Sequence, residues 1–97
     1  MARIVYSENA LGNIERAFEF LAEHDPGIAA EAVEAIRHAV DMLGAHPFVG
    51  RRVEGELREL VISFGRTGYV ALYRYLSSYD VVRILAIRHQ RELDYPD

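Results

Sequence analysis

Hydrophobic residues in the first 24 positions predict a short strand followed by a helix. The strand is the apolar segment 4–6, and Ser7 directly after it is suited to cap the N-terminus of a helix. Over residues 8–24, apolar residues recur at spacings of three and four, as they do on one face of a helix. We expect this face to be buried in the core; it contains Leu11, Ile14, Phe18 and Leu21.

A second helix is predicted over residues 25–45. Asp25 is suited as its N-cap and Pro26 as its first residue, and its interior is rich in alanine, a strong helix former that permits close packing. His46 precedes Pro47 and therefore resists the helical conformation, which ends the helix. Its apolar stripe contains Ala29, Ala32, Ile36, Val40 and Leu43. Because the link between the two helices is tight, we expect an antiparallel helical hairpin.

The second half of the chain predicts three strands joined by short turns. The strands are Leu57–Phe64, Tyr69–Leu76 and Val81–Arg88. Both links are short enough for antiparallel hairpins, and residues 48–56 are expected to form a loop. We therefore predict one α+β domain over residues 1–97, in the order β-α-α-β-β-β. A helical hairpin packs on a mainly antiparallel sheet, and the first strand pairs with one of the C-terminal strands.

Neither of the last two predicted strands has a clean polar face. Side chains alternate along a strand, which sets Tyr69, Ala71, Tyr73 and Tyr75 against Val70, Leu72, Arg74 and Leu76. In the last strand it sets Val82, Ile84, Ala86 and Arg88 against Val81, Arg83, Leu85 and Ile87. Leu72, Ile84 and Leu85 are expected in the core. A sheet that is apolar on both faces needs cover on both. On the side away from the helices, that cover is either a partner chain or a tail or loop of this chain that folds over the sheet.

Charge is unevenly distributed along the 97 residues, which carry a net charge of −4. Residues 1–50 hold three Arg and eight acidic residues, whereas residues 51–97 hold eight Arg and seven acidic residues. All 11 basic residues are Arg, whose planar fork suits phosphate and carboxylate. Whatever the protein binds, we expect the second half to bind it.

Composition also excludes several classes of protein. The chain has no cysteine, and its four His are scattered, so we expect no disulfide, no metal and no cofactor. It has no run of 18 apolar residues, so we expect no membrane span. The first residues lack the apolar core of a signal peptide, which makes a cytoplasmic location the default expectation.

Arginines of the second half form four candidate sites for a target or a phosphate group. They lie in the loop before the sheet, in the first hairpin turn, on the strands, and at the end of the last strand. In that order they are Arg51, Arg52 and Arg58 with Glu54; Arg66; Arg74 and Arg83; and Arg88, His89, Arg91 and Tyr95. A solvated loop and turn, and ion pairs from the strand arginines to Glu59, are the structural alternatives. At the last site, histidine and tyrosine are able to transfer protons.

The order and spacing of several segments resemble the RelE/ParE superfamily of bacterial toxins from type II toxin–antitoxin modules, which includes plasmid stabilisation proteins. After the strand and helix pair come AHPFVGR at 45–51, REL at 58–60, GYVALYRY at 68–75 and VVRILAIRHQR at 81–91. The resemblance implies a RelE/ParE-like fold and growth inhibition. It also implies a cognate antitoxin as partner. The assembly that it implies is either a toxin homodimer or a toxin–antitoxin hetero-oligomer.

The superfamily implies two alternative activities. RelE-like members cleave mRNA on the ribosome without a metal. For such a member, the resemblance assigns Arg88 to the phosphate, His89 and Tyr95 to proton transfer, and Glu54 to the role of a loop acid. ParE-like members instead inhibit DNA gyrase by binding it, and the arginines then act as contacts. Val70 stands where ribonuclease members commonly carry Arg, and with the aliphatic strand around it this favours the ParE-like branch.

Overall fold

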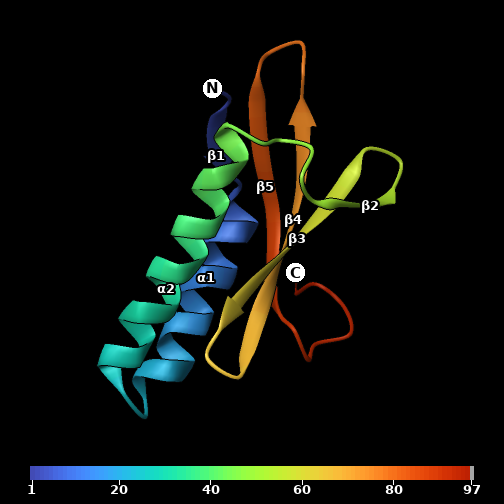
Figure 1. Ribbon diagram of the computed structural model, residues 1–97. Coiled ribbons are helices and arrows are strands. Elements are labelled where there is room, and N and C mark those ends of the chain that lie inside the picture. The colour runs from blue at the N-terminus through green and yellow to red at the C-terminus, as the bar shows by residue number, and fades with distance from the viewer. Residues whose placement is uncertain (97) are drawn as a thin grey trace.

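Two helices cover one face of a five-stranded sheet in the computed structural model, which describes residues 1–96 (Figure 1). The helices are α1 (Glu8–Ala22) and α2 (Pro26–Asp41), followed by one 3₁₀ turn, η1 (Met42–Gly44). The strands are β1 (Arg3–Tyr6), β2 (Arg51–Glu54), β3 (Leu57–Phe64), β4 (Thr67–Leu76) and β5 (Val81–His89). The predicted α+β class is confirmed. Neither helix is long and apolar enough to cross a membrane within the described part of the chain.

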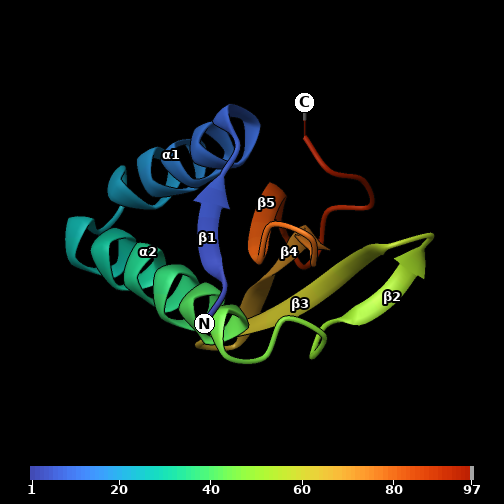
Figure 2. The same cartoon turned by 90° about the horizontal axis from the view of Figure 1, so that it is seen from above.

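The sheet has the order β1-β5-β4-β3-β2, and only its first pair is parallel. β1 lies beside β5 in a register that runs from Arg3 opposite Val81 to Tyr6 opposite Ile84. This confirms the predicted pairing of the first strand with a C-terminal strand. Seen from above, the helices cover the β1–β5 side, and the β2–β3 hairpin extends away from them (Figure 2). The face of the sheet away from the helices is called the open face below.

The expected loop at residues 48–56 contains an additional strand, β2. It pairs with β3 and is irregular between Arg52 and Glu54, and all four of its residues are exposed. Because β2 buries no face, its sequence carries no alternation of apolar and polar residues, and the prediction missed it. The second helix also ends earlier than predicted, since α2 stops at Asp41 and gives way to η1.

The core lies between the helices and the sheet, and the expected core is only partly correct. Its largest fully buried side chains are Tyr73, Ile36, Leu43, Ile84, Val40 and Val82. Leu11 and Phe18, however, are 53% and 37% exposed. The inward face of α1 is centred instead on buried Ala10 and Asn13, so the apolar stripe of this helix is wider than the surface that α2 and β5 cover.

One extra residue in β5 resets its alternation. Leu72 lies opposite Ala86 and Tyr73 lies opposite Ile84, so Leu85 is a bulge with no direct partner in β4. Such an insertion moves every following side chain to the other face. Ile84 and Ile87 therefore both lie in the core, and Arg88 lies on the open face. The sequence expectation that Ile84, Ala86 and Arg88 share one face is wrong for this reason.

The Tyr73 hydroxyl fastens the chain before β2 to the sheet. It accepts a hydrogen bond from the Gly50 amide at 2.9 Å and donates one to the Pro47 carbonyl at 2.8 Å. A Cβ on Gly50 would lie 2.6 Å from this hydroxyl and 2.8 Å from the Glu59 carbonyl, which leaves room for glycine alone. Tyr73 is fully buried, so its two hydrogen bonds are shielded from water.

We expect Tyr73→Phe to lower the free energy of unfolding by about 1–3 kcal/mol, because it leaves the buried Gly50 amide without an acceptor. Tyr6→Phe is the matched control, since the Tyr6 hydroxyl is buried and has no partner among the described residues. Its removal is expected to change stability by less than about 0.5 kcal/mol. Urea unfolding of the two variants measures the difference. Equal losses would contradict the role given to the Tyr73 hydroxyl.

Candidate functional site

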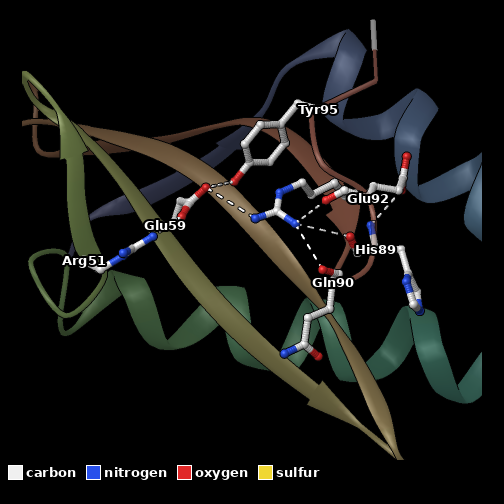
Figure 3. Close-up of polar contacts among 7 residues, drawn as sticks. Arg51, Glu59, His89, Gln90, Glu92 and Tyr95 are labelled. Atoms are coloured by element: carbon white, nitrogen blue, oxygen red, sulfur yellow. Dashed lines mark hydrogen bonds and ion pairs between the residues drawn. The ribbon is translucent and has the colours of Figure 1, made fainter.

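Four side chains from three strands and the tail meet on the open face. This open-face cluster consists of Arg51, Glu59, Arg88 and Tyr95. Figure 3 labels Arg51, Glu59 and Tyr95 within it. The Tyr95 hydroxyl donates to Glu59 Oε2 at 2.5 Å, and Arg51 donates to Glu59 Oε1 at 2.9 Å. The guanidinium of Arg88 lies 3.8 Å from Glu59 Oε2. One carboxylate thus holds together two cations and a phenol.

Arg88 also fixes the turn that begins the tail, residues 90–96. Its guanidinium donates to the Glu92 carbonyl at 2.8 Å and, at 3.4 Å, to the carbonyls of His89 and Gln90. It lies over the Tyr95 ring, 5.2 Å from the ring centre. The donors of this arginine are therefore engaged by groups of the same chain.

The cluster shifts the pKa values of its two titratable partners in opposite directions. Burial pushes the pKa of Glu59 upward, but hydrogen bonds from Tyr95 and Arg51 and the charges of Arg88 and Arg51 outweigh it and hold this pKa below 4.5. Burial raises the pKa of Tyr95, and its hydrogen bond to Glu59 and the charge of that carboxylate raise it further. Near neutral pH, the pair is therefore a carboxylate and a neutral phenol.

The tail supplies part of the cover that the sequence required for the open face. Val70 and Ala86 are only 4% and 3% exposed, although neither belongs to the core beneath the helices. Val70 lies opposite Arg88 in the β4–β5 ladder. The ring of Tyr95 stacks on the guanidinium of that arginine. The end of the tail is tied to the start of α1, since the side-chain Nδ2 of Asn9 donates to the Pro96 carbonyl at 3.4 Å.

His89 points away from the open-face cluster. Its Nδ1 accepts the Arg91 amide at 3.1 Å, so the ring proton is on Nε2, which donates to Thr67 Oγ1 at 2.8 Å. The ring packs edge-on against Tyr69, a residue of the core, with 5.5 Å between the centres. Figure 3 shows this ring directed away from Tyr95. The structure does not bring together the three residues grouped as a ribonuclease site.

The arginines before and within the first hairpin do not converge on one point. Arg52 donates to the Gly55 carbonyl, while Arg58 lies over the Phe48 ring and donates to the carbonyls of Phe48 and Gly50. Arg66 is exposed in the turn between β3 and β4. Glu54 ends β2 opposite Leu57 and does not belong to the open-face cluster. A role in target binding remains a prediction for each of these arginines.

Arg74 and Arg83 lie directly opposite each other on β4 and β5, and both are exposed. The expected pairing of these two residues with Glu59 is wrong, because the ion pairs of Glu59 go to Arg51 and Arg88. These are the only two salt bridges within residues 1–96. Like charges opposite each other destabilise a sheet slightly, so this pair on the open face offers an unneutralised site for an anionic surface.

Sequence reasoning missed the central role of Glu59. The sequence predicts it only as a cross-strand partner of Arg74 and Arg83, although it is the one acidic residue in the apolar pattern of β3. It also missed Thr67, which fixes His89, and Asn13, whose Oδ1 accepts the Ile87 amide at 2.9 Å. A polar residue on the inward side of a predicted helix was the available signal for Asn13.

We expect Tyr95→Phe to destabilise the protein by about 1–2 kcal/mol at pH 7, through loss of a hydrogen bond to a charged group. The lowered pKa of Glu59 means that its contribution is complete above pH 4.5 and is lost as the pH falls through the folded-state value. The difference between wild type and variant should therefore shrink as the pH falls below 4.5 in denaturant titrations. Tyr79→Phe, at a side chain 78% exposed, is the control. A difference that stays constant to pH 3 would contradict this coupling.

Comparison with known proteins agrees with the fold and covers almost the whole chain. Residues 4–94 match the family model of the ParE toxin of type II toxin–antitoxin system, parDE. Two toxins of Caulobacter vibrioides are similar in sequence. Toxin RelE3 is 33% identical over 95% of this chain and 98% of its own length, and toxin RelE1 is 38% identical over 84% and 88%.

Solved structures share the fold at low sequence identity. A chain of the chromosomal ParDE system from P. aeruginosa superposes with a TM-score of 0.73 at 22% identity, over 92% of this chain and 96% of that one. A chain of the intact E. coli RelBE toxin–antitoxin complex gives 0.67 at 12% identity, over 95% and 100%. The helical hairpin, the mixed sheet and the family match lead to one conclusion: this chain belongs to the ParE toxins of type II toxin–antitoxin systems, within the RelE/ParE superfamily.

Proposed function

We propose that this toxin arrests growth by binding and inhibiting DNA gyrase in the cytoplasm, and that a cognate antitoxin neutralises it. The main observation in support is that His89 and Tyr95 lie on opposite faces of the sheet. Cleavage of RNA by general acid–base catalysis needs two proton-transferring groups within reach of one phosphate. A pair separated by a sheet does not meet this requirement.

The engaged state of the same groups also favours binding over catalysis. Both ring nitrogens of His89 have partners, the Tyr95 hydroxyl is bound to Glu59, and Arg88 is held by the tail and by Glu59. The raised pKa of Tyr95 makes its phenol a weak proton donor. Val70, at the position where ribonuclease members commonly carry Arg, is buried next to Arg88 and supplies no charge.

The open face has the composition of a protein-binding surface. Arg74 and Arg83 form its exposed cationic part, next to partly exposed Leu72 and Leu85, and Val61 of β3 is 62% exposed on the same face. Protein interfaces combine arginine with apolar side chains in this way. We propose that this part of the open face contacts an acidic surface of gyrase.

The alternative is a RelE-like endoribonuclease that cleaves mRNA on the ribosome. One observation favours it, namely that Arg88, Glu59 and Tyr95 lie together on a single surface. There the Glu59 carboxylate, with its lowered pKa, is ionised and available as a base once the tail moves away. In this alternative His89 has no catalytic part, which differs from the assignment that the resemblance implied.

We expect charge reversal at either arginine of the cationic pair to weaken gyrase inhibition. Purified Arg74→Glu and Arg83→Glu should each need at least about tenfold more protein to inhibit supercoiling of relaxed plasmid, the effect of losing a well-placed interface arginine. Arg37→Glu is the matched control, because Arg37 is exposed on α2, away from the open face. Unchanged inhibition by both open-face variants would overturn the proposed contact.

We also expect His89→Gln to remain toxic when it is expressed without antitoxin, since a catalytic role for this residue does not fit its position. Growth, DNA supercoiling and full-length mRNA are measured in the same cultures. Fragmented mRNA with normal supercoiling in the wild type, lost in His89→Gln, would reject gyrase inhibition in favour of the ribonuclease.

A further inference from the structure

A small pocket of about 190 Å³ lies at the β2–β3 hairpin, in the part of the sheet that extends beyond the helices (Figure 2). Its walls come from the loop before β2, from the hairpin itself and from the end of β4 with the turn after it. They are Phe48, Arg52, Glu56, Arg58, Tyr75 and Ser77. We call it the hairpin pocket. Its volume is below the roughly 300 Å³ at which ligand pockets usually begin, so it holds one group of a ligand and not a whole molecule.

The hairpin pocket and the open-face cluster lie on opposite faces of the sheet. Arg58 lies opposite Arg52 in β2 and opposite Tyr73 in β4, and residues that lie opposite each other project to the same face. Tyr73 is buried in the core on the helix side, so both arginines project to that side. The next residue of β3, Glu59, projects to the other face, where it holds the open-face cluster together.

Two arginines opposite each other give the hairpin pocket its positive charge. Like charges in this position destabilise a sheet. Both salt bridges within residues 1–96 involve Glu59, so neither Arg52 nor Arg58 is part of an ion pair in the described chain. Glu56 also lines the pocket and lowers its positive charge without pairing with either arginine. An anion placed between the two guanidinium groups would remove their repulsion.

Main-chain carbonyls hold both guanidinium groups in place. Arg58 Nη1 donates to the carbonyls of Phe48 and Gly50 at 3.1 and 2.8 Å. Arg52 donates through Nε and Nη2 to the Gly55 carbonyl at 3.1 and 2.9 Å. Although these bonds go to different carbonyls, Nε and Nη2 of Arg58 and Nη1 of Arg52 have no acceptor within residues 1–96 and are left for a ligand. Arginine forks fixed in this way suit phosphate oxygens, because less side-chain entropy is lost when the ligand binds.

Phe48 supplies an aromatic wall beside the two cations. The guanidinium of Arg58 lies 5.1 Å from the centre of its ring, and Tyr75 meets the ring at a right angle with 5.2 Å between the centres. These contacts orient the ring, yet Phe48 is still 61% exposed. Aromatic side chains next to arginines are the combination with which proteins hold a base and its phosphate together. The exposed part of this ring is therefore suited to a flat base.

We propose that the hairpin pocket binds the phosphate of a nucleoside monophosphate. The phosphate oxygens accept hydrogen bonds from Arg52 and Arg58 inside the pocket, and the base packs outside it on the exposed ring of Phe48. A free nucleotide is favoured over a nucleic-acid chain, because the pocket holds one phosphate and the protein has a net charge of −4, which disfavours a polyanion. The inference does not rest on the proposed function, since the pocket is not part of the open face.

The test is a calorimetric titration of the purified toxin with adenosine monophosphate (AMP), inorganic phosphate, adenosine and a short oligothymidylate. AMP should bind at least about tenfold more tightly than inorganic phosphate, the effect of one contact between a base and an aromatic ring. Adenosine should not bind at the same concentrations, because it lacks the phosphate. Equal affinity for AMP and inorganic phosphate would overturn the proposal, and so would binding of adenosine alone. Tighter binding of the oligothymidylate than of AMP would overturn the assignment to a free nucleotide.

Two substitutions in the hairpin pocket should change the affinity for AMP in opposite directions. Arg52→Gln should raise the Kd at least about tenfold, through loss of hydrogen bonds to a charged group. Glu56→Gln should lower the Kd about twofold or more, because it removes a like charge beside the phosphate. Arg37→Gln on α2 and Arg74→Gln on the open face are the matched controls, since both arginines are exposed and lie away from the pocket. Wild-type affinity in Arg52→Gln, weaker binding in Glu56→Gln, or an equal loss in either control would overturn the proposal.

Phe48→Leu tests the aromatic wall of the hairpin pocket separately from its charge. Leucine keeps an apolar side chain but removes the flat ring, so AMP should lose its advantage over inorganic phosphate while the Kd for inorganic phosphate stays the same. An unchanged circular dichroism spectrum shows that the variant is folded. A folded Phe48→Leu with wild-type affinity for AMP would overturn the contact with the base. If this variant does not fold, Arg52→Gln and Glu56→Gln still decide whether the pocket is the binding site.

Discussion

The parallel pairing of β1 with β5 is the constraint on which the rest of the structure depends. A parallel pair needs a crossover connection, and here the crossover begins with both helices, which therefore cover one face of the sheet. β1 spans only Arg3–Tyr6, whereas β5 spans Val81–His89. The unpaired part of the β5 edge is capped by side chains of Ser7, Asn9 and Asn13. The groove between α1 and the end of β5 and the open face are both consequences of this arrangement.

The bulge at Leu85 determines which side chains at the end of β5 lie on each face of the sheet. Without the extra residue, Arg88 would point into the core beneath the helices and His89 would point to the open face beside Glu59. With it, the charge of Arg88 reaches the carboxylate of Glu59, and His89 packs on Tyr69. Glu59 then pairs with both Arg88 and Arg51, which leaves the arginine pair of β4 and β5 without an acidic partner within residues 1–96.

The sequence by itself determined the elements whose signals are local. Ser7 caps α1 by accepting the Ala10 amide, and Asp25 caps α2 by accepting the amides of Gly27 and Ile28, as their positions before apolar periodic segments predicted. The bounds of β3 were also predicted correctly, because its residues alternate and turn residues flank it. The order of motifs identified the superfamily. The two caps and β3 depend on neighbours within a few positions, and the order of the motifs is read directly along the chain, so the sequence contains both kinds of information.

Only the tertiary structure decided the features that depend on distant neighbours. Phe18 is partly exposed because the surface under α1 is narrower than its apolar stripe, and the sequence of α1 does not contain the width of that surface. β2 buries no face, and the bulge at Leu85 arises between β4 and β5, so neither leaves a local pattern. Glu59 became the centre of the open-face cluster when residues 36 positions apart met across the sheet. The sequence shows which side chains are present, whereas only the folded structure shows which of them lie close together.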